Sequence, residues 1–147
     1  MNISLEKIDL ENISELKVSY EEGYSRITNY LNILVIKYAG VYGVGSGGNS
    51  DATFMFAKAA FAIAAIEPFA IIIDLTDLKY VWGDQLEMIF NIQKPMALIV
   101  GEHCQEAIGT LIHGIESIEP PTTISWIFDN LEDAWNYLEN EIEKQAQ

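Results

Sequence analysis

Residues 68–84 have the sequence PFAIIIDLTDLKYVWGD, and this stretch predicts the centre of the fold. Its segment from Ala70 to Leu75 has three consecutive isoleucines and only one ionisable residue. Such a run is typical of a strand that is buried on both faces of a parallel sheet. Functional side chains of α/β sheets tend to follow the carboxyl ends of the strands. The candidates at this end are Asp74, Asp77, Trp82, Gly83 and Asp84.

Strand-like and helix-like segments alternate along the rest of the chain. Connections of this length favour crossovers and a mainly parallel or mixed sheet of four to five strands. We therefore predict the α/β class and a single domain over residues 1–147, with residues 1–30 as a lead-in segment and residues 31–147 as strand-helix units. The predicted strands are 33–36, 70–75, 96–100 and 123–128, and the predicted helices are 51–66, 84–90, 104–113 and 131–142.

The lead-in segment predicts a hairpin at one edge of the sheet. Its two extended pieces are 16–20 and 24–28, and Glu21-Glu22-Gly23 has the composition of a turn between them. At the other end of the chain, Asp129 and Glu132 have the spacing of a capping box for the last helix.

The charge of the chain narrows the classes of partner. The formal charge is −14, from 22 acidic and 8 basic residues, and Arg26 is the only arginine. Binding nucleic acid requires Lys and Arg to neutralise phosphates, and binding anionic lipid requires a similar basic cluster. We therefore expect neither a nucleic acid nor a membrane as partner. A basic protein partner is compatible with this charge.

Cysteine content and hydropathy predict a cytoplasmic protein. Cys104 is the only cysteine, so the chain has no internal disulfide, as is usual in a reducing compartment. The amino terminus lacks the pattern of a signal peptide. The most apolar segment, 52–66, is interrupted by Lys58 and would span roughly 22 Å, against about 30 Å for a bilayer core.

The helix predicted at 51–66 has more apolar surface than a small domain needs. It has 13 apolar residues in 16, and they are spread around its axis. A helix that is apolar all round is buried on more than one side. Two explanations follow: the helix contacts a second copy of the chain, or the amino-terminal segment covers it.

A glycine-rich loop precedes this helix. Gly43, Gly45 and Gly48 fit the pattern G-x-G-x-x-G after a strand and before a helix, as in dinucleotide-binding loops. Asp51 would bring a carboxylate close to the phosphates, and Asn49, Ser50 or Asp51 could cap the helix. The alternative to nucleotide binding is a flexible or tightly turning loop.

No set of residues predicts catalysis convincingly. Cys104 is expected near the start of a helix, but Glu102 and Glu106 oppose a thiolate there, so a structural thiol is the preferred interpretation. Asp74, Asp77 and Asp84 could together hold Mg²⁺, although capping of turns and helices explains them more simply. We predict no cofactor and no resident metal. The residues leave enzyme activity open but favour a protein without it.

Residues 72–86, IIDLTDLKYVWGDQL, resemble the central motif of STAS domains, the fold of bacterial anti-sigma factor antagonists. The similarity covers about residues 32–143 and includes the strand at 96–101 and the segment 128–134. The family pattern is an apolar strand, Asp-Leu-Ser, an apolar-x-aromatic step and Asp-Ser-Ser-Gly-Leu. The resemblance implies a regulatory protein-protein interaction module.

The STAS resemblance places Asp84 where family members have a serine that is phosphorylated to release a partner. Aspartate carries charge at a helix start but cannot be switched by a serine kinase. The resemblance therefore implies a docking surface at Trp82, Gly83, Asp84 and Asp77 without the usual regulation. The segment 94–101 is also similar to one strand of enoyl-CoA hydratases, whose complete fold needs a much longer chain.

Three hypotheses of function follow from these patterns. The first is a non-enzymatic interaction module of STAS-like type that also self-associates. The second is a protein or enzyme that binds a nucleotide or acyl-CoA at the loop of Gly43, Gly45 and Gly48. The third is an acidic inhibitor or immunity-type protein that blocks a basic partner.

Overall fold

A five-stranded sheet runs through the computed structural model, which describes residues 2–114 and 119–145 apart from the side chain of Asp84. The strands lie in the order in which they occur in the chain. The first is antiparallel to the second, and all the others are parallel. The predicted α/β class with a mixed sheet is confirmed. The strands are β1 (Lys17–Tyr24), β2 (Asn32–Val41), β3 (Ala70–Lys79), β4 (Met96–Val100) and β5 (Ile127–Phe128).

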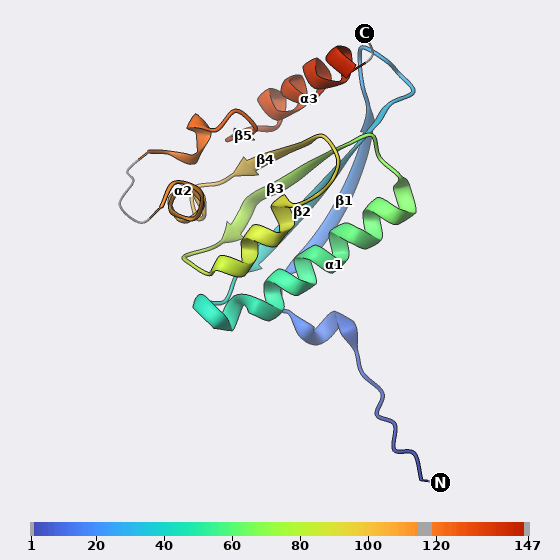
Figure 1. Ribbon diagram of the computed structural model, residues 1–147, viewed down its shortest axis with the longest axis vertical. Helices are drawn as coiled ribbons and strands as arrows, with labels where there is room; N and C mark the ends of the chain where they lie inside the picture. The colour runs from blue at the N-terminus through green and yellow to red at the C-terminus, as the bar shows by residue number, and fades with distance from the viewer. Residues whose placement is uncertain (1, 115–118, 146–147) are drawn as a thin grey trace.

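Helices cover both faces of this sheet (Figure 1). The connections from β2 to β5 all step in one direction across the sheet, and right-handed crossovers then place their helices on one face. The last helix, which follows β5, packs on the opposite face. The α-helices are α1 (Asn49–Ile66), α2 (Gln105–His113) and α3 (Leu131–Gln145). The 3-10 helices are η1 (Leu10–Ile13), η2 (Gly45–Gly48), η3 (Asp84–Phe90) and η4 (Pro121–Thr123).

β3 supplies side chains to both hydrophobic cores. Ile71 and Ile73 belong to the core beneath α1, η3 and α2, whereas Ala70 and Ile72 belong to the core beneath α3. All four are fully buried. Alternation of this kind explains why an unbroken apolar run forms the central strand, as the sequence predicts.

β3 continues beyond the predicted end of the strand. It runs to Lys79, so Asp77 lies within the strand and not in a loop after it. The register shifts between Lys37 and Ala39 of β2, where Asp74 accepts a hydrogen bond from the backbone N–H of Thr76. The prediction failed because a bulge admits two exposed polar residues without ending the strand.

The predicted hairpin at 16–28 is wrong in detail, although the first strand does lie at the edge of the sheet. β1 runs straight through Glu21, Glu22 and Gly23, and residues 25–31 make the turn to β2. A Cβ atom on Gly23 would lie only 2.8 Å from the indole of Trp135 in α3. Gly23 therefore makes room for a distant aromatic ring instead of making a turn.

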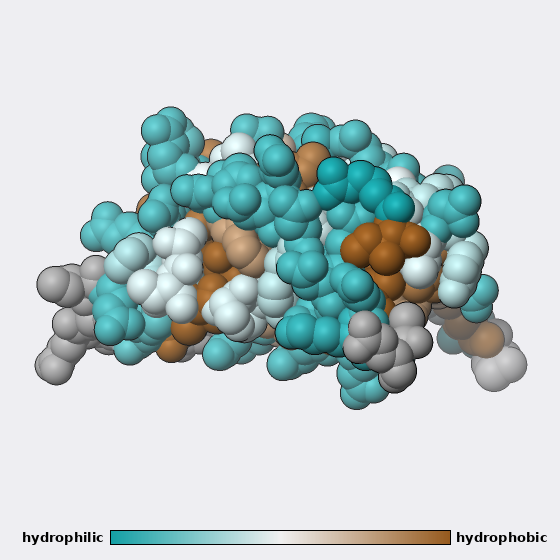
Figure 2. Space-filling model, turned by 90° about the horizontal axis from the view of Figure 1, so that it is seen from above, coloured by the Kyte–Doolittle hydropathy of each residue, from teal (hydrophilic) through white to brown (hydrophobic). Residues whose placement is uncertain are grey.

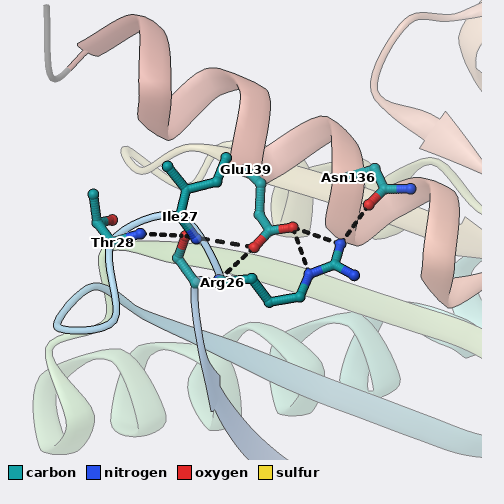
Figure 3. A network of polar contacts seen from close by, with 6 residues as sticks. Arg26, Ile27, Thr28, Asn136 and Glu139 are labelled. Atoms are coloured by element: carbon teal, nitrogen blue, oxygen red, sulfur yellow. Dashed lines mark hydrogen bonds and ion pairs between the residues drawn. The ribbon is translucent and has the colours of Figure 1, made fainter.

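The loop after β1 is held to α3 by one buried carboxylate (Figure 3). Glu139 accepts hydrogen bonds from the backbone N–H of Arg26 at 2.5 Å and from its guanidinium at 2.6 Å and 3.0 Å. Asn136 accepts a further bond from the same guanidinium. Burial raises the pKa of the Glu139 carboxyl, but the bonds from Arg26 outweigh it and lower the pKa below its usual value.

Two other predicted boundaries need correction. The strand predicted at 123–128 is reduced to β5, which has two residues, Ile127 and Phe128, and Thr123 belongs to the 3-10 turn Pro121–Thr123. The capping residue of α3 is Asn130 and not Asp129. The side chain of Asn130 accepts a hydrogen bond from the backbone N–H of Asp133 at 2.9 Å. The predictions at 84–90 and 96–100 are confirmed, although the helix at 84–90 is of 3-10 type. The helix predicted at 104–113 begins one residue later, at Gln105.

Outside the two cores, the surface over α3 is largely hydrophilic. Figure 2 views the molecule from the α3 side and shows mostly hydrophilic residues with a few hydrophobic areas. This agrees with a helix that has one apolar stripe, in which Ala134, Leu138 and Ile142 are buried. None of the helices in the described residues combines the length and hydrophobicity that crossing a bilayer requires.

Candidate functional site

Two loops meet at the carboxyl end of β2 and β3. The backbone N–H of Tyr42 donates to the carbonyl of Lys79 at 2.9 Å, and that of Gly45 donates to the carbonyl of Trp82 at 3.1 Å. The sequence suggested two separate sites, the glycine loop and the segment around Trp82. The structure brings them together in one surface.

The indole of Trp82 lies directly against Gly45. The φ angle of Gly45 is +58°, and a Cβ atom there would lie 2.4 Å from the indole. Gly48 is equally crowded, because its Cβ atom would lie 2.2 Å from the ring of Tyr42. Both positions therefore need glycine for close packing of the loop.

The backbone amides of the glycine loop are engaged within the chain. Gly43 donates its N–H to the carboxylate of Asp51 at 2.8 Å, and Ser14 donates its hydroxyl to the same carboxylate at 2.5 Å. α1 begins at Asn49 with Gly48 as its capping residue, so the predicted capping by Asn49, Ser50 or Asp51 is wrong. The Asp51 carboxylate instead occupies the helix start, where a phosphate would bind in a dinucleotide site.

The topology also removes the usual crevice for a nucleotide. In doubly wound folds, ligands bind where the strand order reverses and neighbouring helices diverge to opposite faces. The strand order here never reverses. The helices that follow β2, β3 and β4 pack together on one face (Figure 1).

Two tyrosines form the floor of this surface. The rings of Tyr42 and Tyr80 are 5.1 Å apart and nearly perpendicular, and the Tyr80 hydroxyl donates to the carbonyl of Gly83 at 2.7 Å. The Tyr42 hydroxyl is buried and has no hydrogen-bond partner among the described residues. Burial, with a smaller contribution from the charge of Asp51, raises the pKa of Tyr42 to about 12. This phenol stays neutral at physiological pH.

Four exposed apolar residues surround these loops. We call Val41, Val44, Val81 and Trp82 the rim patch; their exposed fractions are 68%, 56%, 56% and 57%. Trp82 was predicted from the sequence, but the three valines were not. The sequence feature that could have identified the valines is the presence of β-branched residues at and beyond the strand ends, where turns on a protein surface normally have polar residues.

An acidic cleft adjoins the rim patch. Its volume is about 310 Å³, and Val81, Glu102, His103 and Glu106 are among the residues that line it. His103 and Glu102 are 3.3 Å apart, and both side chains are largely exposed. An apolar surface beside negative charge suits a partner that presents an apolar group next to a basic one.

Asp77 does not belong to this surface. It lies with Asp74 and Lys37 on the part of the sheet that α3 leaves uncovered, where they line a depression of about 290 Å³. Asp84 follows Gly83 at the start of η3, but its side chain lies outside the described residues, so its predicted docking role stays a prediction. Within residues 2–114 and 119–145 no three His, Cys, Asp or Glu side chains gather as metal ligands would.

Cys104 is a buried residue at the start of α2. Its thiol accepts the backbone N–H of Gly101 at 3.4 Å and donates to the carbonyl of Leu75 at 3.5 Å. Burial raises the pKa of the thiol to about 11, and the hydrogen bond from Gly101 only partly opposes this. The structure therefore supports the structural role that the sequence favoured.

Comparisons of the chain with protein-family models, with curated proteins and with solved structures gave no match, and so none of them identifies a STAS domain.

Proposed function

We propose that this protein is a non-enzymatic interaction module that binds a protein partner at the rim patch. The observation that carries the proposal is the exposed Trp82, held against Gly45 beside three exposed valines. Large aromatic side chains on a well-packed support are the usual energetic centre of protein interfaces. A rigid loop also lowers the entropic cost of binding.

The partner in this proposal has a basic segment. The acidic cleft beside Val81 and the formal charge of −14 favour a lysine or arginine next to the apolar group that contacts Trp82. The proposal thus joins the interaction module with the basic partner that the charge suggested. A cytoplasmic location, inferred from the single cysteine, belongs to the same proposal.

The resemblance of residues 72–86 to STAS domains adds a regulatory element to the proposal. Asp84 stands where those domains have a phosphorylated serine. Binding at the rim patch would then be constitutive instead of being switched by a kinase. This part rests on the resemblance alone.

A peptide-display selection against the immobilised protein tests the proposal. We expect selected peptides to combine an aromatic or branched aliphatic residue with Lys or Arg. Their affinity should fall at least tenfold in Trp82→Ala and should weaken in Glu102→Gln/Glu106→Gln. Phe61→Ala, an exposed aromatic on α1, is the matched control and should bind normally.

Two results would contradict the proposal. Peptides that bind Trp82→Ala as tightly as the wild type would place the interface elsewhere. A thermal shift with nucleotides or acyl-CoA would favour the ligand-binding alternative, since a ligand at 100 times its dissociation constant adds about 2.7 kcal/mol to the free energy of unfolding.

A further inference from the structure

The outward face of α1 is apolar along most of the helix. From Phe56 to Ile66 every exposed residue is apolar, and Phe56 and Phe61 have exposed fractions of 41% and 67%. The amino-terminal segment covers only one side of the helix, where Lys58 pairs with Glu11 of η1. The explanation that this segment fully covers the helix is therefore wrong. A face of this kind on a soluble domain marks an interaction site.

A groove runs along this face. It lies between α1 and residues 91–94, has a volume of about 330 Å³ and is lined largely by apolar atoms of Phe56, Ala60, Ile63 and Ala64. Lys94 lies at one edge and donates to the carbonyl of Pro68 at 2.7 Å. The groove is thus apolar along its length and has a cation at its edge.

The same chain carries an exposed amino-terminal segment with three large apolar side chains. Residues 2–9 form neither helix nor strand, and every one of them is exposed. This arm leaves the body at η1 and points away from the sheet (Figure 1). Ile3, Leu5 and Ile8 are exposed to 67%, 89% and 73%. An extended arm therefore presents three large apolar side chains to the solvent, with Glu6 and Lys7 between Leu5 and Ile8.

We propose that the arm of one copy binds in the α1 groove of a second copy, and that the exchange is reciprocal. Each surface supplies what the other lacks: apolar side chains for the groove, and Glu6 for the cation of Lys94. A two-fold dimer forms both contacts at once. The acid-free face of α1 also lets two copies with a charge of −14 approach closely.

The dimensions of the arm permit this exchange. Seven extended residues reach about 23 Å, whereas the helix from Phe56 to Ala64 measures about 12 Å. The arm can therefore extend along the whole groove and still cross the gap between two copies. Its own groove lies on the other side of α1 from η1, since η1 and the segment after it pack beside Phe54.

The molar mass in solution tests the dimer. At about 100 µM the wild type should elute from size exclusion with light scattering at twice 16.5 kDa. Ala60→Glu, which fills the groove with charge, and Leu5→Ser/Ile8→Ser, which removes the apolar groups of the arm, should both give folded monomers. Val44→Ser in the rim patch is the control and should remain a dimer. A monomeric wild type, or dimers that persist in both variants, would overturn the proposal.

Disulfide trapping decides whether the contact is between copies. Leu5→Cys and Ala60→Cys are placed on separate chains, mixed and oxidised; the native Cys104 is buried in each. A disulfide-linked pair of the two variants supports exchange. In the double variant, a monomer closed by an internal disulfide would show that the arm covers its own groove, which contradicts the proposal. These outcomes do not depend on Trp82. The experiments on partner binding and on self-association can therefore contradict one proposal without affecting the other.

Discussion

Gly45 and Gly47 lie two residues apart in one loop but have different surroundings. Gly45 has a left-handed backbone and the indole of Trp82 against it, whereas a Cβ atom on Gly47 would meet no atom within 4 Å. We expect Gly45→Ala to lower the free energy of unfolding by about 1–2 kcal/mol, the cost of a left-handed alanine, and to displace the indole. Gly47→Ala should change it by less than about 0.5 kcal/mol. Urea titration and tryptophan fluorescence measure the two effects; equal behaviour would contradict the packing described.

Cys104 should be unreactive in the native protein. With a pKa of about 11, the fraction of thiolate at pH 8 is small, and burial also blocks access. We expect alkylation by iodoacetamide at pH 8 to be at least about a hundredfold slower than that of a free cysteine. Urea-unfolded protein provides the control and should react at the ordinary rate. Fast alkylation of the folded protein would reopen the question of a reactive thiol.

At the level of single elements, α3 depends on the carboxylate of Glu139. This buried group accepts hydrogen bonds from both the backbone and the side chain of Arg26 (Figure 3). Glu139→Gln removes the charge but keeps one acceptor oxygen, and water can reach the guanidinium of Arg26, which is 67% exposed; the free energy of unfolding at pH 7 should therefore fall by about 0.5–1.5 kcal/mol. Glu143→Gln, exposed on the same helix, should have almost no effect.

The contribution of the Glu139 carboxylate to the free energy of unfolding should decrease in acid. The pKa of Glu139 is lower in the folded than in the unfolded chain, where a value of about 4.3 is normal. The contribution is therefore fully present above about pH 4.3 and is lost as the pH falls through the folded-state pKa. Urea titrations at pH 7 and pH 3 should show the difference between wild type and Glu139→Gln shrinking in acid. A constant difference would show that the charge of Glu139 is unimportant.

The elements that sequence analysis predicted well are those whose own residues determine them. The apolar run at 70–75 and the α3 stripe are examples, because each is decided by burial of its own side chains. The incorrect predictions lie where the local structure depends on a contact with a residue far away in the sequence. Gly23 lies in a strand with the indole of Trp135 packed against it, and Trp82 contacts the glycine loop at Gly45. Neither contact has a signal in local sequence.

For the whole molecule, the net charge makes a prediction about salt. With 22 acidic and 8 basic residues, repulsion within the folded chain should outweigh the contribution of its few surface ion pairs. Raising NaCl from 20 mM to 300 mM shortens the screening length to below about 10 Å and should raise Tm by a few degrees. Differential scanning fluorimetry measures this change. A fall in Tm would show that ion pairs such as that of Arg26 and Glu139 dominate.

The strand order of the sheet also bears on how the protein is made. Each strand pairs with the one before it in the chain, and none has to insert between two that are already joined. The nascent chain can therefore extend its sheet at one growing edge as it leaves the ribosome, with β1 and β2 as the starting hairpin. α3 emerges after β5 and covers the second core, so synthesis that stops before residue 131 would leave Ile33, Val35 and Ile72 uncovered and open to aggregation.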